Sequence, residues 1–173
     1  MRHTSLANAL HTEGINLSVI SRTLAGLSPV EFDKEVRPLR EYLEQFNSDG
    51  KLAQLMLVDN VTDHIVDGLY VRELLIPKGS VILSRVHKKA LVNILSKGRV
   101  IVIDSNGHNE YVAPCTFTSI AGTQRVVIAP EETVWNTAHA TDTTNPNDLL
   151  ENLSCENYTD FISYSGKLIE DNI

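Results

Sequence analysis

The sequence contains little cysteine and no long apolar run. Its two cysteines, Cys115 and Cys155, lie far apart among 173 residues, and no CxxC pair occurs. These absences exclude a disulfide framework and a structural zinc site, and they predict two free thiols in a reducing compartment. No window approaches the ~18 apolar residues of a membrane span, and no segment has the form of a signal peptide. We therefore expect a cytoplasmic protein that does not enter a membrane.

Basic side chains are nearly missing from the end of the chain. Residues 131–173 hold nine of the 22 acidic side chains but only one of the 15 basic ones, Lys167. The rest of the chain is close to neutral, although the formal net charge of the whole is −7. Binding to a nucleic-acid backbone needs a net basic surface, so this distribution argues against a nucleic-acid partner.

The N-terminal part, residues 1–60, is predicted to be an arm that contains one helix. Ser28 is a cap-forming residue, and Glu31 follows it at the spacing of a capping box. Apolar residues then recur at the spacing of one buried helical face, which predicts a helix over about 29–46. Pro38 interrupts this run, so we expect either a kink or a short helix that restarts there.

Beyond residue 50 the helical periodicity ends and strand signals begin. Residues 51–58 form a short apolar run that fits either a strand or a buried helix. Residues 61–141 contain short runs of β-branched and aromatic residues separated by turn signals, of which Asn106-Gly107 is the strongest. Such strands without intervening helices predict a β sandwich or barrel. Residues 142–173 are acidic, and their leucines predict one short helix that docks on the barrel or on a partner.

The stretch IPKGSVILSRVHKKALVNILSKG resembles the first motif of the cupin barrels, in which two alternating histidines and an acid bind a metal. Residues two apart on a strand point to the same face, which is why that spacing suits a metal inside a barrel. Here Arg85 takes the first histidine position, His87 keeps the second, and Leu91 or Val92 replaces the acid. Arg125 stands where the second cupin motif supplies its histidine. The resemblance thus implies a degenerate metal site that holds no metal.

A longer succession, from GLYVRELLIPKGS to ETVWNTAHAT, covers about 70 residues. It resembles a family of uncharacterised cupin-like proteins encoded by tailed bacteriophages. The resemblance implies a mostly β, cupin-like jelly-roll barrel with an N-terminal helical arm and a short acidic C-terminal segment. It also implies a location in the host cytoplasm during infection or in the virion, whereas it implies no particular activity.

Several polar residues are candidates for a site inside such a barrel. Strand alternation places His87 on one face with Arg85, and His139 on one face with Trp135 and Thr137. We predict a ligand-binding site composed of His87, His139, Arg85 and Arg125. The alternative is a site for a divalent transition metal composed of His64, Glu73, His87 and His139. A simpler interpretation makes the histidines hydrogen-bonded barrel residues and Trp135 a core residue.

Two functions follow from these features. The first is a non-enzymatic phage protein that acts through protein contacts, as a capsid-decorating or other virion-associated component, and that forms homo-oligomers. The alternative is a small-ligand or metal-binding cupin, or a residual metalloenzyme. A sugar-nucleotide isomerase is a third reading, but no His–Asp dyad can be assigned. No catalytic residue is predicted, because the sequence has no Ser-His-Asp order, nucleotide-binding loop or HExxH helix.

Overall fold

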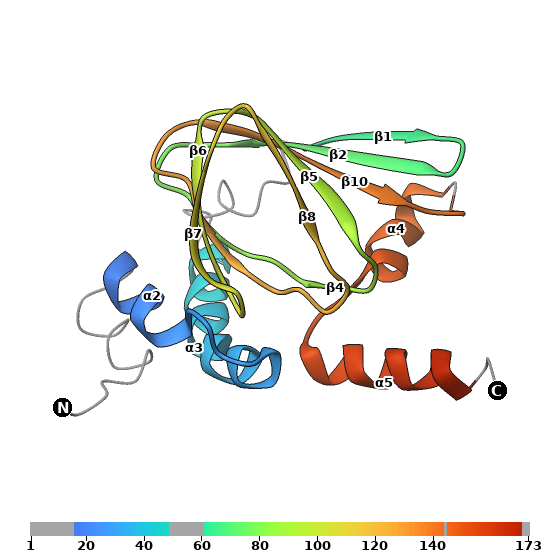
Figure 1. Cartoon of the computed structure of the whole chain (residues 1–173), viewed down its shortest axis with the longest axis horizontal. Helices are drawn as coiled ribbons and strands as arrows, with labels where there is room; N and C mark the ends of the chain where they lie inside the picture. Colours follow the sequence, from blue (N-terminus) through green and yellow to red (C-terminus); the bar gives the residue numbers. More distant parts are fainter. Residues whose placement is uncertain (1–15, 49–60, 144, 171–173) are drawn as a thin grey trace.

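The computed structural model describes residues 16–48, 61–143 and 145–170 of the chain (Figure 1). The run 51–58, for which a strand and a helix were both open, lies outside these residues. The elements in chain order are α2 (Leu17–Leu24), α3 (Pro29–Ser48), β1 (Val61–Val66), β2 (Leu69–Ile76), β3 (Val81–Leu83), β4 (Val86–His87), β5 (Leu91–Lys97), β6 (Arg99–Asp104), β7 (Gly107–Val112), β8 (Cys115–Ser119), β9 (Val126–Ile128), β10 (Thr133–Ala140), α4 (Pro146–Leu153), β11 (Ser154–Cys155) and α5 (Tyr158–Glu170).

The strands form three antiparallel sheets. The larger two have the orders β1-β2-β10-β5-β8 and β3-β9-β6-β7, and the third pairs β11 with β4. The two larger sheets face each other around a core that includes Leu95, Val100 and Trp135. The predicted fold class is thus confirmed: the protein is mostly β, a barrel of antiparallel sheets with short helices at both ends of the described chain. Within the described ranges, none of the helices combines the length and apolarity needed to cross a membrane.

Strand β6 shows why its sequence is a continuous apolar run instead of an alternating one. Its side chains are covered on both sides of the sheet. Ile101 and Ile103 pack with residues of α2 and α3, whereas Val100 and Val102 belong to the core inside the barrel. A strand buried on both faces has no solvent side on which polar residues would be favoured. The N-terminal helices therefore cover the outer face of the four-stranded sheet.

Helix α3 begins where the sequence predicts. The Ser28 hydroxyl accepts a hydrogen bond from the Glu31 amide at 3.4 Å, and the Glu31 carboxylate accepts one from the Ser28 amide at 3.2 Å. The helix continues through Pro38, so the predicted restart at this residue is wrong. The flanking residues Val36 and Leu39 are fully buried against the barrel. Their packing offsets the backbone hydrogen bond that a proline inside a helix removes.

The C-terminal segment docks on the barrel. Strand β11 pairs with β4, so that Ser154 lies opposite His87. Leu149 and Leu153 of α4 are buried against Tyr70 of β2. The prediction of one short helix in this segment is incomplete, because α5 follows β11. Its start is fixed by local polar contacts that apolar periodicity does not reveal: Asn157 Oδ1 accepts a hydrogen bond of 3.0 Å from the Asp160 amide, and Asn157 Nδ2 donates one of 2.8 Å to the Asp160 carboxylate.

Candidate functional site

The barrel contains a cavity of about 550 Å³. Both large sheets and helix α4 contribute to its lining. Cavities that hold small molecules in proteins have volumes of roughly 300–1,000 Å³. The size of this cavity is therefore that of a ligand site.

Strand register divides the lining into three levels. Residues two apart on β2 share its inner face, and each lies opposite a residue of β10: Leu74 opposite Trp135, Arg72 opposite Thr137 and Tyr70 opposite His139. We call the first level the floor, and it also includes Ile76, Ile82 and Val127. The middle level, the belt, is formed by Arg72, Thr137, Asn93 and Arg125. The third, the α4 end, is formed by Tyr70, His139 and His87 with the leucines of α4.

Arg125 is the central cation of the belt. Its Nη2 donates a hydrogen bond of 2.5 Å to Ser119 Oγ, which also accepts one of 2.7 Å from Asn93 Nδ2. Asn93 in turn accepts a hydrogen bond from Trp135 Nε1 at 3.2 Å. The Arg125 side chain forms no ion pair with any described residue, although the residue is only 4% exposed. Burial accordingly lowers the pKa of Arg125, because it disfavours the charged form.

The other two arginines of the cavity have carboxylate partners. Arg72 Nε lies 3.3 Å from Asp63 Oδ1, and Arg85 Nη2 lies 3.1 Å from Glu151 Oε1. The side chain of Asp63 is partly exposed and that of Glu151 is largely exposed, so each ion pair contributes little to stability. The pairs nevertheless balance the charge of these two arginines, whereas no carboxylate lies within ion-pair distance of Arg125 among the described residues. The charge of the buried Asp104 acts on Arg125 from outside the cavity lining and partly offsets the effect of burial on its pKa.

Two imidazoles lie together at the α4 end. The rings of His87 and His139 have centroids 5.9 Å apart, and Tyr70 stacks on His139 at 5.7 Å. Burial, together with the charge of Arg125, lowers the pKa of His87 to about 3. Burial and the charge of Arg72 lower the pKa of His139 to about 4. Both rings are therefore neutral at pH 7 and able to offer one donor and one acceptor each.

Three buried polar atoms in this cavity have no hydrogen-bond partner in the protein. They are Arg85 Nε, His87 Nδ1 and Arg125 Nε, and no other described side chain has such an atom. The two arginine nitrogens can only donate. Leaving a buried donor unpaired costs about 1–3 kcal/mol, and more when the group is charged. The cavity therefore concentrates unused hydrogen-bond donors, which is the arrangement that an anion or another strong acceptor would satisfy.

The structure brings together all four residues predicted for the ligand site. His87, His139, Arg85 and Arg125 line the same cavity. Other polar residues of the cavity wall were not predicted from the sequence, among them Tyr70, Arg72 and Asn93. Asn93 had a usable signal, since it stands at an inward position between the buried Leu91 and Leu95 of an alternating strand. A buried polar residue at such a position indicates a hydrogen-bonding role.

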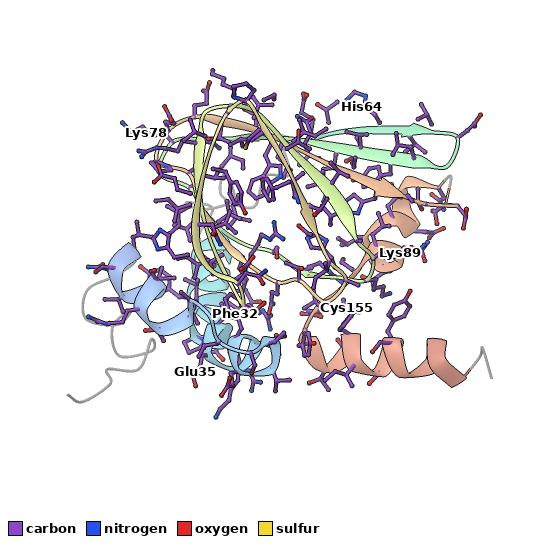
Figure 2. All side chains as sticks on the ribbon, viewed as in Figure 1. Phe32, Glu35, His64, Lys78, Lys89 and Cys155 are labelled. Atoms are coloured by element: carbon purple, nitrogen blue, oxygen red, sulfur yellow. The ribbon has the colours of Figure 1, made fainter. Side chains whose placement is uncertain are left out.

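The alternative metal site does not form. Glu73 lies between Arg72 and Leu74 on β2, and because both of these line the cavity, alternation turns Glu73 to the outer face. His64 is exposed on β1, at the margin of the barrel (Figure 2). In the part of the chain that the structure describes, no group of three or more His, Cys, Asp or Glu side chains could hold a metal ion. Trp135, 3% exposed, packs in the core, as the simpler interpretation predicts.

Solved structures similar to this chain are those of cupin-domain proteins. A cupin domain from Bordetella pertussis is 20% identical, with a TM-score of 0.40 over 47% of this chain and 91% of that chain. An acetylacetone dioxygenase from Acinetobacter johnsonii is 17% identical, with a TM-score of 0.42 over 46% and 58%. A cupin-2 domain containing protein from Shewanella frigidimarina is 10% identical, with a TM-score of 0.41 over 47% and 79%. At these identities the likeness concerns the fold alone. No protein-family model and no curated protein matches the chain.

Proposed function

We propose that this protein is a non-catalytic binding protein for a small organic anion, which it holds inside the barrel. The observation that carries the proposal is the presence in one cavity lining of Arg125, a buried guanidinium without an ion pair among the described residues, together with Arg85 and His87, which like Arg125 each hold a buried and unpaired polar atom. An anion would accept hydrogen bonds from the arginine donors and would neutralise the charge of Arg125. The remainder of the wall is largely apolar, which suits an organic molecule better than a hydrated inorganic ion.

A thermal-shift screen tests this proposal. We expect at least one of benzoate, citrate, octanoate and inorganic phosphate to raise the melting temperature of the wild-type protein, because a ligand that binds only the folded state stabilises it by about 2.7 kcal/mol at 100 times its Kd. The same anion should not stabilise Arg125→Met. Arg37→Met is the matched control, since it removes an exposed arginine of α3 that lies outside the cavity. If no anion acts, or if it stabilises both variants equally, the proposal is wrong.

The predicted role in protein contacts is a second candidate, and the outer face of the five-stranded sheet favours it. Leu75, Val92 and Ile94 are 40%, 37% and 39% exposed on this face. On the neighbouring strand β10, Val134 lies opposite Leu75 and Ala138 opposite Val92, while Asn136 lies opposite Ile94, so the surface is apolar with one amide within it. Such a patch on an otherwise polar surface marks a site of protein association. We propose that a second copy of the chain covers it, and that the assembly is the form in which the protein would join a phage particle.

Light scattering on a sizing column tests this second candidate. We expect the wild-type protein to elute as a closed oligomer and Ile94→Lys to elute as a smaller species, because a lysine in a packed sheet interface leaves a buried charge without a partner. Ile162→Lys is the control, since Ile162 is an exposed isoleucine of α5 on another part of the molecule. A monomeric wild type that also fails to sediment with phage particles would exclude this role. The anion-binding proposal does not depend on either result.

A further inference from the structure

The charge and shape of the cavity together narrow the class of ligand, and this step rests on the proposed anion-binding function. We infer that the ligand is a monocarboxylic acid with an apolar body, whose carboxylate lies at Arg125 in the belt and whose body lies on the floor.

The charges of the side chains that line the cavity favour a ligand with a single negative charge. Arg72 pairs with Asp63, and Arg85 pairs with Glu151, so these two arginines are already balanced. His87 and His139 are neutral at pH 7. Arg125 is therefore the cavity cation without an ion pair among the described residues, and the carboxylate that acts on its charge, Asp104, is not part of the cavity lining. A monoanion matches this charge, whereas a dianion such as a phosphate monoester would bring a second buried charge without a partner. A neutral ligand would leave the arginine unpaired.

The unpaired donors select a group with more than one acceptor. Arg125 Nη2 is used by Ser119 Oγ, but Arg125 Nε is buried and unpaired, and so are the nearby His87 Nδ1 and Arg85 Nε. A carboxylate has two oxygens that can accept from several donors at once. One carboxylate has enough acceptor sites for the Arg125 guanidinium and for the His87 ring, whose pKa is already influenced by the charge of Arg125. A hydroxyl or a carbonyl oxygen would satisfy fewer of these donors.

The floor provides the binding surface for the rest of the molecule. It is formed by Leu74, Ile76, Ile82, Val127 and Trp135, without a charged side chain. Leu74 and Ile82 are half-buried and present accessible apolar surface to the cavity, whereas Ile76, Val127 and Trp135 are already almost fully buried. An apolar group placed against Leu74 and Ile82 would be removed from water. Each buried CH₂ group contributes about 0.8 kcal/mol to such binding. Charge in the belt and apolar residues below it together define an amphipathic acid.

Calorimetric titration of the wild-type protein with eight-carbon compounds tests this inference. The probes are octanoate, octanol, octyl phosphate and the dicarboxylate suberate, with acetate as the acid without an apolar body. We expect octanoate to bind about tenfold or more tightly than each of the others, because each of them loses the charge match or the buried chain. Trp135 is the one tryptophan of the chain and lies on the floor, so octanoate should also change its fluorescence.

One variant and its control test whether the apolar body of the ligand lies on the floor of the cavity. Leu74→Phe fills part of the floor and should weaken octanoate at least about fivefold while acetate binding is unchanged. Leu69→Phe is its control, since Leu69 lies on the same strand, is 40% exposed and does not line the cavity. The wild-type series needs neither variant, so a variant that fails to fold leaves the test of ligand class intact.

The outcomes separate this inference from the proposed function. Tight binding of octyl phosphate, suberate or citrate that requires Arg125 would support anion binding and overturn the monocarboxylate class. Equal affinity for octanol and octanoate would overturn the role of charge, and with it both proposals. Binding of none of the anions, at concentrations that saturate ordinary ligand sites, would also overturn both.

Discussion

Replacing Arg125 with methionine is expected to raise the free energy of unfolding of the ligand-free protein by about 1–3 kcal/mol and to abolish binding of octanoate. Arg125 is a buried cation without an ion-pair partner among the described residues, and its Nε is unpaired. Methionine has similar length and no charge to desolvate. Ser119 Oγ would keep its hydrogen bond from Asn93, so the change creates no new unpaired atom there. Urea denaturation measures the first effect and calorimetry the second.

The combination of these two effects is what distinguishes a binding residue from a structural one. Replacing a residue that stabilises the fold should lower the free energy of unfolding. A residue that serves to bind a ligand can instead destabilise the ligand-free protein, so that replacing it raises the free energy of unfolding. Arg37→Met, on the exposed side of α3, should change stability by no more than about 0.5 kcal/mol. If Arg125→Met destabilises the ligand-free protein by more than this control does, Arg125 is a structural residue and the argument from its unpaired Nε fails.

Gly98→Ala is expected to destabilise the protein by about 3–4 kcal/mol. Gly98 joins β5 to β6 and has a φ of 81°. This backbone conformation is strained for any residue that has a Cβ atom. A Cβ atom added there would overlap the carbonyl oxygen of Glu132 and would lie 2.8 Å from Thr133 Cα. Thr133 cannot easily move away, because its Oγ1 accepts a hydrogen bond from the Arg99 amide at 3.3 Å and the residue is fully buried. The free energy of unfolding in urea gives the magnitude.

Gly79→Ala is the matched control for this substitution. Gly79 has a similar φ of 84°, but the space around an added Cβ atom is open. We therefore expect only the cost of the left-handed backbone, about 1–2 kcal/mol. Equal losses for the two variants would mean that the backbone conformation, and not the close approach of Glu132 and Thr133, determines the requirement for glycine at position 98.

Much of the fold was predictable because local chemistry agrees with the tertiary structure. The capping box at Ser28 and the turn at Asn106-Gly107 both lie where the chain needs them. The restart at Pro38 was wrong because packing of α3 on the barrel outweighs a local propensity. Helix α5 was missed although its apolar residues have a helical spacing as clear as that of α3, because its start depends on the side chain of Asn157, which accepts a hydrogen bond from the Asp160 amide.

The site was predictable only in part, for a related reason. Strand alternation brought His87, Arg85 and His139 to the inner face, and the cupin motif pointed to Arg125. Alternation alone could not tell that Glu73 points outward, because that depends on which face of β2 the second sheet covers. The pairing of Arg85 with Glu151 joins residues 66 positions apart, and it arises from the docking of α4 on the barrel. Which arginine is left without a counter-charge is thus a property of the assembled fold.

The position of β10 has a consequence for how the chain reaches this fold. It is the last long strand in the sequence, yet it lies between β2 and β5 in the middle of the five-stranded sheet. The β1–β2 hairpin and the β5–β8 pair can form early, but neither contacts the other until β10 arrives between them. Pairing between distant segments slows folding. A newly made chain would therefore expose the unpaired edges of β2 and β5 until residues 133–140 emerge, and this interval is when it is most open to aggregation.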